Sequence, residues 1–342
     1  MSSINFPAQT KVNPSFSEPD FLLTYAQPSG CFALLESGAP RKKMGEGSLY
    51  VYINSLDIRS ERQASQFSPS FLPSASLSAT YGQTQTYNLQ VRCEYGFDDL
   101  AAASNYNVSL PAALDFANKQ GIYQGMRSML LYGLTPGNGE GLLNTVGAMA
   151  VNLPPDSYGN TTTQTYDNGE MALWFLQQVT NLVIGMYQTG AQQKGKIVIL
   201  SPQRVFVQFQ LANVVQITTY QRPGAGTATT AELIQKVAKD AGYDIEWYYD
   251  DTLEGKGAGG ADAVLLTMPE IETPAIPGIN TNEFGQTQPH LNAVNLMYTD
   301  MAAPMKIPTP TPDGALTEIQ RIRASCGWCV RPQGLYVLSL PY

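Results

Sequence analysis

Two cysteines near the C-terminus, Cys326 and Cys329, have the spacing of redox-active dithiols, in which the first cysteine begins a helix. Here the surrounding residues favour a strand, on which positions three apart point to opposite faces. A zinc site would need Cys31, Cys93 or His290 to converge on this pair, without a second closely spaced pair of ligands. We therefore expect neither redox chemistry nor a bound metal here.

A glycine-rich stretch, residues 255–260, matches the G-x-G-x-x-G pattern of dinucleotide-binding loops. That chemistry requires a strand before the loop and a helix after it, so that the helix N-terminus faces the pyrophosphate. Residues 243–248 and 263–268 both favour strands, so strand-like sequence lies on both sides. The pattern predicts a flexible hairpin tip and no bound nucleotide.

The remaining candidates for catalysis are a lone histidine and two pairs of neighbouring carboxylates. His290 is the single histidine and lies in a stretch rich in glycine, proline and asparagine, which favours an exposed loop. Asp98-Asp99 and Asp250-Asp251 could serve acid–base or metal chemistry, but adjacent carboxylates in loops are commonly solvated. We predict no catalytic residue, cofactor or metal, with a cytosolic α+β enzyme that uses an acid pair as an alternative.

Charged residues are scarce: they make up 14% of the 342 residues, against about 25% in an ordinary soluble protein. The hydrophobic fraction of 43% is ordinary, so a sizeable core is expected. The net charge of −8 disfavours a groove for nucleic acid, because phosphate binding depends on Lys and Arg. Polar residues interrupt the most apolar run, residues 171–187, and the N-terminus lacks a signal-peptide pattern. These patterns predict a protein of the reducing cytosol, with no membrane contact.

The first hundred residues predict extended structure. Residues 1–47 contain five prolines and no sustained helical or strand period, which indicates an extended arm. Residues 49–53 favour a strand, and residues 63–91 carry no charge. We expect the two halves of this uncharged stretch to pair as a long hairpin with a loose middle near Pro69 and Pro73. Such a hairpin has unprotected edges, which favours a surface that another subunit covers, with an ordinary sheet inside one domain as the alternative.

The clearest helix is residues 109–132, in which Ser109 suits the N-cap and Pro111 the first turn. Glycine costs about 1 kcal/mol inside a helix, so Gly121 and Gly125 indicate close contact with neighbouring backbone. The apolar side is expected to consist of these residues: Ala113, Phe116, Ala117, Tyr123 and Leu130.

The second half of the chain alternates irregularly between helices and strands. A broad apolar face predicts a helix over residues 168–188, with no charge from residue 171 to residue 193, and residues 197–200 predict a short buried strand. Thr229 and Glu232 have the capping-box spacing that begins a helix. Residues 316–340 alternate enough to suggest two strands. The fold class is therefore α+β, with a mixed sheet, helices, a projecting hairpin and an extended arm.

The order of these elements resembles the major capsid proteins of tailed bacteriophages, which have the Hong Kong 97-type fold. An arm, an uncharged hairpin and a long helix precede Gly141-Leu142-Leu143-Asn144, a segment that follows the long helix in one branch of that family. Residues 197–202, an apolar strand before a helix-starting proline, and residues 327–340 are similar to later elements of the family. The resemblance covers residues 45–342 and rests on the order of the motifs.

The resemblance implies a subunit that assembles itself into an icosahedral shell around a phage genome. Residues 1–47 would be the N-terminal arm, and residues 48–96 the extended loop that lies over a neighbour. Residues 97–144, with the long helix as a spine, and residues 316–342 would form the peripheral domain. Residues 145–315 would form the axial domain.

The same resemblance implies partners and a location. The chain would form pentamers and hexamers of itself, join a portal and a decoration protein, and enclose DNA without sequence-specific binding. The short segment before the hairpin implies a separate scaffolding protein. The protein would be made in the host bacterial cytoplasm and reside in the virion capsid, away from any membrane. An encapsulin-like cargo compartment and a tail or head-decoration protein remain as alternatives.

Two groups of residues are assigned to this role. Basic and aromatic residues in or beside the hairpin are candidates for assembly contacts: Arg41, Lys42, Lys43, Arg59, Arg62, Tyr81 and Tyr87. The glycines of the spine helix, Gly121 and Gly125, are candidates for bending during shell expansion.

Overall fold

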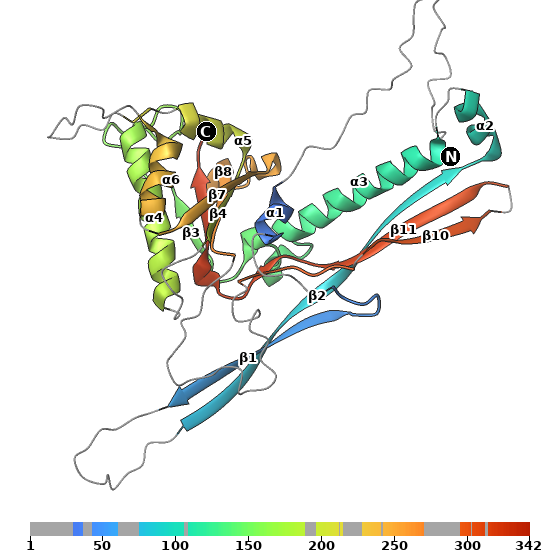
Figure 1. Cartoon of the computed structure of the whole chain (residues 1–342), viewed down its shortest axis with the longest axis horizontal. Helices are drawn as coiled ribbons and strands as arrows, with labels where there is room; N and C mark the ends of the chain where they lie inside the picture. Colours follow the sequence, from blue (N-terminus) through green and yellow to red (C-terminus); the bar gives the residue numbers. More distant parts are fainter. Residues whose placement is uncertain are drawn as a thin grey trace, which may run out of the picture.

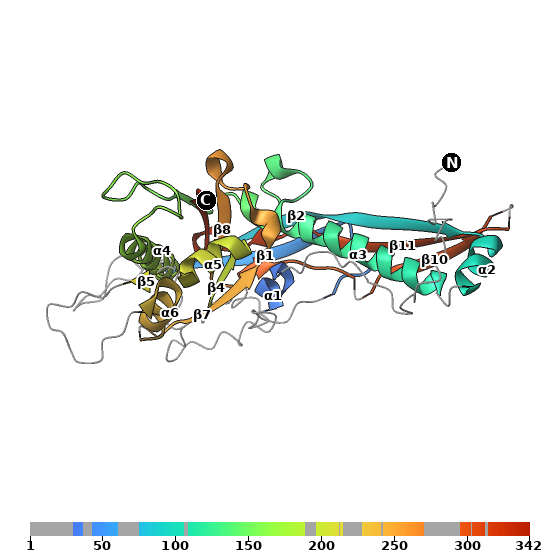
Figure 2. The ribbon, with the colours of Figure 1, turned by 90° about the horizontal axis from the view of Figure 1, so that it is seen from above.

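The structure is a computed structural model that describes residues 30–36, 43–60, 75–105, 109–188, 196–211, 213–214, 228–240, 242–269, 295–301, 303–311 and 314–342. It has a long, thin part and a compact part, which follow one another along the longest axis of the molecule (Figures 1 and 2). A hairpin projects away from the region where the two parts meet.

A four-stranded antiparallel sheet forms much of the long part. Its strands, in spatial order, are β1 (Tyr50–Ser60), β2 (Ala75–Tyr95), β11 (Leu316–Ser325) and β10 (Met305–Pro310). β2 changes its partner along its length, because it pairs with β1 up to Gln85 and with β11 from Thr86 onward. The β1–β2 hairpin therefore continues past the end of β11 and forms the projection in Figure 1.

The predicted hairpin is present, but its pairing is different. Of the residues 63–91 that were expected to pair with each other, residues 75–85 pair with β1 and residues 86–91 pair with β11. Residues 61–74, with Pro69 and Pro73, lie outside the described residues. The limits of the uncharged stretch at residues 63–91 do not coincide with the limits of the hairpin strands, because β1 contains Asp57 and Arg59.

Helix α3 (Leu110–Leu131) lies beside this sheet and matches the predicted long helix. Its two central glycines face β2. A Cβ added to Gly121 would lie 3.4 Å from Val91, and one added to Gly125 would lie 3.2 Å from Leu89. The glycines thus leave room for two β2 side chains, so the close contact is with side chains and not with the neighbouring backbone that was expected. Their role as bending points remains a prediction.

The buried side of α3 differs from the predicted one. Leu130 is buried as expected and Tyr123 is half-buried, but Phe116 is 40% exposed. Ala113 and Ala117 are exposed as well. The buried positions are Leu110, Asn118, Ile122, Met129, Leu130 and Leu131. The side of α3 in contact with β2 is the one that carries Gly121 and Gly125. The pattern of apolar residues did not predict this side, because glycine adds no apolar side chain to it.

A five-stranded mixed sheet forms the centre of the compact part. Its strands, in spatial order, are β3 (Met149–Asn152), β13 (Leu335–Leu340), β8 (Asp262–Thr267), β4 (Lys196–Ser201) and β7 (Asp244–Tyr249). β13 is parallel to β3 and β4 is parallel to β7, whereas β8 is antiparallel to both of its neighbours. The mixed sheet expected from the sequence is confirmed.

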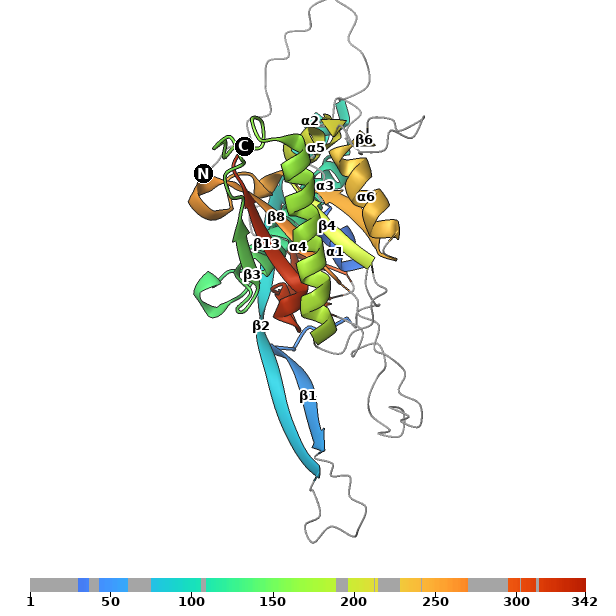
Figure 3. The same ribbon diagram turned by 90° about the vertical axis from the view of Figure 1, so that its left-hand side faces the viewer.

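Helices cover one face of this sheet, as Figure 3 shows: α4 (Asn168–Gln188), α5 (Gln203–Leu211) and α6 (Thr230–Asp240). Ile197 and Ile199 of β4 pack into the core on that side, together with residues of the three helices. Val198 and Leu200 belong to a second core, since alternate strand residues point to opposite faces. That second core includes Met129 at the end of α3, so it joins the five-stranded sheet to the long part.

Several elements were not predicted: α1 (Cys31–Glu36), α2 (Phe97–Asn105) and β10. α1 lies within the predicted extended arm, yet Cys31 and Leu34 are fully buried in the second core. β10 contains Pro308 and Pro310, which are tolerated because the strand lies at the edge of its sheet. The remaining short strands are β5 (Asn213–Val214), β6 (Ala228–Thr229), β9 (Leu296–Met297) and β12 (Trp328–Cys329).

Two predicted groupings of strands differ in the structure. β7 and β8 are not a hairpin, because β4 lies between them, so the glycine-rich residues 255–260 connect non-adjacent strands. The closing strands are also separated: β11 belongs to the four-stranded sheet and β13 to the five-stranded sheet. Nearness along the chain thus does not determine strand partners.

The helix starts follow local rules. The capping box is confirmed, because Thr229 N donates to Glu232 Oε2 at 3.1 Å and Glu232 N donates to Thr229 Oγ1 at 3.2 Å. Ser109 occupies the N-cap of α3 with extended backbone, but its side chain makes no capping hydrogen bond.

Candidate assembly interface

The segment before the hairpin is held against β11 and its surroundings. Lys43 forms an ion pair with Asp300, and Met44 N donates to the Asp300 carbonyl at 3.0 Å. Glu46 forms an ion pair with Arg321 of β11. The predicted assembly residue Lys43 therefore has a partner within its own chain. Exposed pairs of this kind are worth under about 1 kcal/mol each.

Five of the other six predicted assembly residues fall into two groups. Arg41, Lys42 and Arg62 lie outside the described residues. Arg59 and Tyr81 belong to the hairpin, where they pair with Ser76 and Asn54 respectively. Their contacts with neighbouring subunits remain predictions.

The root of the hairpin carries an exposed, uncharged face. Tyr50 and Tyr52 of β1 are 44% and 56% exposed, and their ring centroids are 6.1 Å apart. They lie opposite Gln85 and Gln83 of β2, and directly paired residues project from the same face. β1 is the edge strand of its sheet among the described strands, so the aromatic face lies beside a sheet edge. Aromatic side chains are enriched in protein interfaces, and charged ones are depleted from interface cores.

A pocket of about 360 Å³ opens beside this face. It is lined by three hairpin residues, by the turns that follow α3 and by β12: Gln83, Thr84, Gln85, Asn138, Gly139, Glu140, Thr145, Val146, Trp328 and Cys329. Glu140 is the one charged side chain in this lining.

Tyr87, another predicted assembly residue, is bound inside the subunit. Its hydroxyl donates to the Glu140 carboxylate, at 2.8 Å from Oε1 and 3.0 Å from Oε2. Burial is the main reason why the pKa of Tyr87 is raised, and the Glu140 charge raises it further. The Gly141-Leu142-Leu143-Asn144 segment follows directly and forms a 3₁₀ turn at Leu142–Asn144.

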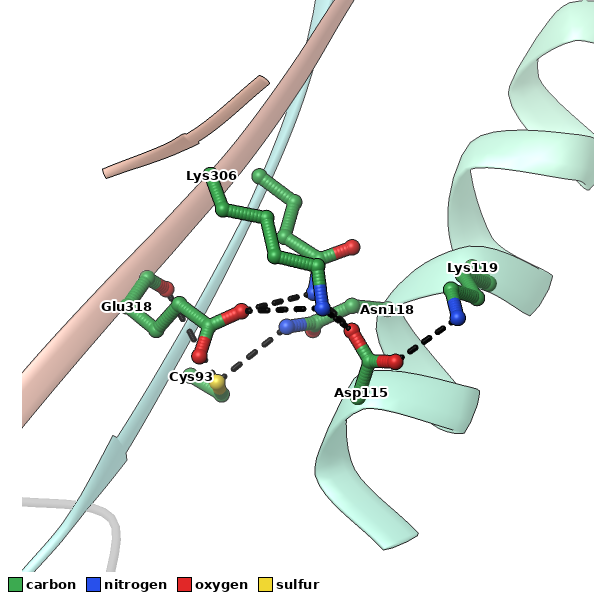
Figure 4. A network of polar contacts seen from close by, with 7 residues as sticks. Cys93, Asp115, Asn118, Lys119, Lys306 and Glu318 are labelled. Atoms are coloured by element: carbon green, nitrogen blue, oxygen red, sulfur yellow. Dashed lines mark hydrogen bonds and ion pairs between the residues drawn. The ribbon is translucent and has the colours of Figure 1, made fainter. Parts of the chain in front are cut away.

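A second polar network ties α3 to the four-stranded sheet (Figure 4). Asp115 of α3 accepts from Lys119 at 2.7 Å and from Gln320 Nε2 of β11 at 2.6 Å, and it also pairs with Lys306 of β10. Asn118 Nδ2 donates to Cys93 Sγ of β2 at 3.1 Å. Hydrogen bonds from Lys119, Lys306 and Gln320 lower the pKa of Asp115 well below its usual range.

This network predicts acid sensitivity. A carboxylate with a lowered folded-state pKa stabilises the fold above its unfolded pKa of about 4, and this contribution is lost as the pH falls further. The stability difference between wild type and Asp115→Asn is therefore expected to be constant from pH 7 to pH 5 and to shrink below about pH 4. Urea unfolding at each pH measures it. A difference that stays the same down to pH 2 would show that the Asp115 charge contributes nothing.

The cysteine pair is unsuited to thiolate chemistry. Cys326 and Cys329 are both buried, and burial raises the pKa of each thiol to about 12. Cys326 Sγ lies 3.6 Å from Glu140 Oε2, and Cys329 Sγ lies 3.2 Å from Asn295 Oδ1. Within the described ranges, no group of three or more His, Cys, Asp or Glu side chains could hold a metal ion.

Three carboxylates of the two acid pairs serve local structure. Asp99 Oδ2 accepts from Gly96 N at 2.9 Å at the start of α2. Asp250 Oδ1 accepts from Thr252 N at 3.0 Å, and Asp251 Oδ1 accepts from Gln203 N at 2.9 Å. His290 lies outside the described residues. Among the helices of the described segments, none is long and apolar enough to cross a membrane.

Comparison with known proteins identifies the fold. No family model and no curated protein matches the sequence. The structure, however, is similar to the capsid of Myoviridae phage XM1, with a TM-score of 0.68 at 11% identity over 96% of this chain and 97% of that one. Mycobacterium phage Bobi gives a TM-score of 0.56 at 9% identity, covering 96% and 95% of the two chains. The capsid of an empty GTA particle gives 0.55 at 10% identity, covering 97% and 96%. The chain therefore has the α+β, Hong Kong 97-type fold of tailed-phage capsid proteins.

Proposed function

We propose that the protein is a major capsid protein, which assembles into an icosahedral shell around a phage genome. The observation that carries the proposal is the similarity to the phage XM1 capsid, which spans nearly the whole of both chains. The role is structural, with no catalytic step. The proposed location is the virion capsid, after synthesis in the host bacterial cytoplasm.

The proposed subunit has an arm at residues 1–47 and a hairpin loop at residues 48–96. Its proposed peripheral domain is residues 97–144 with residues 316–342, and β11 of this domain shares a sheet with β2. Its proposed axial domain is residues 145–315, which contribute β3, β4, β7 and β8 to the five-stranded sheet. Two strands cross between these domains, because β13 belongs to the five-stranded sheet and β10 to the four-stranded one.

The exposed surface supports a subunit that acts in contact with copies of itself. The aromatic hairpin face and the exposed Phe116, Leu173 and Leu211 are spread over both parts of the molecule. A shell gains its stability from many modest interfaces of this kind, each with an apolar core and a polar rim. A net charge of −8 lets the shell enclose DNA without binding it tightly. We also propose pentamers and hexamers as the units, with a scaffolding protein, a portal and a decoration protein as partners.

The proposal predicts that assembly depends on the hairpin. The full chain, expressed and then mixed with phage lysate, is expected to sediment as multi-subunit particles. A variant in which a short Gly-Ser linker replaces residues 51–84 removes the projection but keeps the β2–β11 pairing. It is expected to remain folded and to sediment as single subunits or small oligomers. Particles of unchanged size and yield from this variant would contradict a role for the hairpin in assembly.

A further inference from the structure

A buried carboxylate lies at the root of the hairpin. Glu140 is 8% exposed, and it accepts from the Tyr87 hydroxyl, from Thr135 N at 3.1 Å and from the Cys326 thiol at 3.6 Å. In the part of the chain that the structure describes, no Lys or Arg lies within ion-pairing distance of it. Its charge is thus stabilised by hydrogen bonds alone, and each lost donor leaves a buried charge less well solvated.

Tyr87 stands where the hairpin leaves the body. Gln85 is the last β2 residue paired with β1, and Thr86 is the first one paired with β11. The hydrogen bond from Tyr87 to Glu140 therefore lies one residue after Thr86, where β2 begins to pair with β11 instead of β1. A small rotation there moves the end of an eleven-residue strand by a much larger distance.

The backbone behind Glu140 is packed too tightly to shift. A Cβ on Gly133 would lie 2.5 Å from the Glu140 carbonyl oxygen, and one on Gly141 would lie 2.4 Å from Gly133 N. Gly141 N donates to the Gly327 carbonyl at 2.9 Å, and a Cβ on Gly327 would lie 2.3 Å from the Leu130 carbonyl oxygen. Close packing of this kind leaves the Glu140 backbone little room to move.

Side-chain packing does not fill the space on the hairpin side. The 360 Å³ pocket lies between residues 83–85 of β2 and the turns at 138–140 and 145–146. The pocket separates these β2 residues from the turns after α3, whereas a Cβ on the neighbouring Gly82 would lie 3.6 Å from the Trp328 ring. Beside the pocket, the Tyr87 hydroxyl connects β2 to the turn after α3, through Glu140 and, at 3.4 Å, Thr135 Oγ1.

We propose that Glu140 is a positioning residue, which fixes the direction of the β1–β2 hairpin through the Tyr87 hydroxyl. The inference concerns the single subunit and stands apart from assembly. Its consequence for a shell, a narrower range of subunit tilts, rests on the proposed function. The residue makes no contact with a substrate and takes part in no reaction.

The test measures hairpin direction in the isolated subunit. Spin labels on p-acetylphenylalanine at residue 57 of β1 and residue 124 of α3 leave the native cysteines unmodified. Pulsed electron resonance then gives the distribution of the distance between the labels. Tyr87→Phe is expected to broaden this distribution and shift its mean. Glu140→Ala is expected to do the same, and Glu140→Gln, which keeps an acceptor oxygen, is expected to restore part of the wild-type distribution.

The matched control is Tyr132→Phe. The Tyr132 hydroxyl donates to the Thr252 carbonyl at 2.6 Å, so this variant loses a similar hydrogen bond that does not touch the hairpin. Urea unfolding is expected to show a similar loss of stability for both tyrosine variants, whereas only Tyr87→Phe changes the distance distribution. An unchanged distribution for Tyr87→Phe, or an equal broadening for Tyr132→Phe, would overturn the proposal. If Glu140→Ala does not fold, the distance distributions of Tyr87→Phe and Glu140→Gln test the proposal without it.

Discussion

Gly141→Ala is expected to destabilise the folded chain by roughly 3 kcal/mol or more, because two costs of backbone strain and steric overlap add. Gly141 has φ 86° and ψ 147°, a conformation that residues with a side chain rarely adopt. An added Cβ would lie 2.4 Å from both Gly133 N and the Tyr132 carbonyl carbon, and 2.8 Å from the Leu131 carbonyl oxygen. These are backbone atoms at the end of α3, so no side-chain rotation relieves the contact.

The control for this prediction is Gly137→Ala in the preceding turn. A Cβ on Gly137 would meet nothing within 4 Å, and the residue is exposed. Its effect is expected to lie within about 0.5 kcal/mol of zero. Urea unfolding of both variants, followed by circular dichroism, compares them. Equal unfolding midpoints for the two variants would mean that the turn after α3 is not tightly packed.

Arg204→Met is expected to cost roughly 2–4 kcal/mol, because it leaves a buried carboxylate without its cation. Arg204 Nε and Nη2 donate to Asp262 at 2.7 and 2.5 Å, and Asp262 is 1% exposed. Without the guanidinium, the Gly255 N–H at 2.9 Å is the hydrogen bond to Asp262 that remains. The variant also loses the stacking of Arg204 on Tyr342, whose ring centroid is 4.7 Å away.

Replacing the other partner, Asp262, is expected to lower the free energy of unfolding by less than Arg204→Met does. Arg204 is 35% exposed and also lies 3.3 Å from Glu254, so Asp262→Asn leaves a cation that water and a second carboxylate still solvate. Its expected cost is about 1 kcal/mol. Thermal and urea unfolding of the two single variants measure this asymmetry. An equal cost for both, or a larger cost for Asp262→Asn, would contradict the unequal burial of the two partners.

Local rules allowed three of the helices, α3, α4 and α6, to be predicted from the sequence. The capping box at Thr229 and Glu232 marks the start of α6, and the apolar face of residues 168–188 matches α4. These signals lie within a few residues of one another, so they do not depend on the rest of the fold. The prediction of the buried side of α3 was wrong because the helix contacts β2 through Gly121 and Gly125, which carry no hydrophobic side chain.

Strand partners depend on distant residues and were harder to predict. β4 lies between β7 and β8 although it precedes both by more than forty residues, and no local pattern in the glycine-rich loop indicates this. β10 was missed because Pro308 and Pro310 argue against a strand unless its position at the edge is known. The partner change within β2 likewise requires knowledge of β11.

The candidate site was predicted only in part. The sequence indicated the hairpin and the segment after α3, but it assigned Tyr87 to contacts between subunits and did not identify Glu140. The hydroxyl of Tyr87 is bound to Glu140 within the subunit. The spacing of Gly133, Gly139 and Gly141 was the available signal, because three glycines with positive φ around Glu140 indicate a tight turn.

Electron microscopy tests the central claim most directly. The chain is expressed, incubated with or without phage lysate, purified by sedimentation and imaged. The account predicts closed shells, or curved lattices of pentamers and hexamers, with the β1–β2 hairpin of each subunit lying on a neighbour. A discrete monomer under both conditions, or rings and tubes without such a lattice, would contradict it.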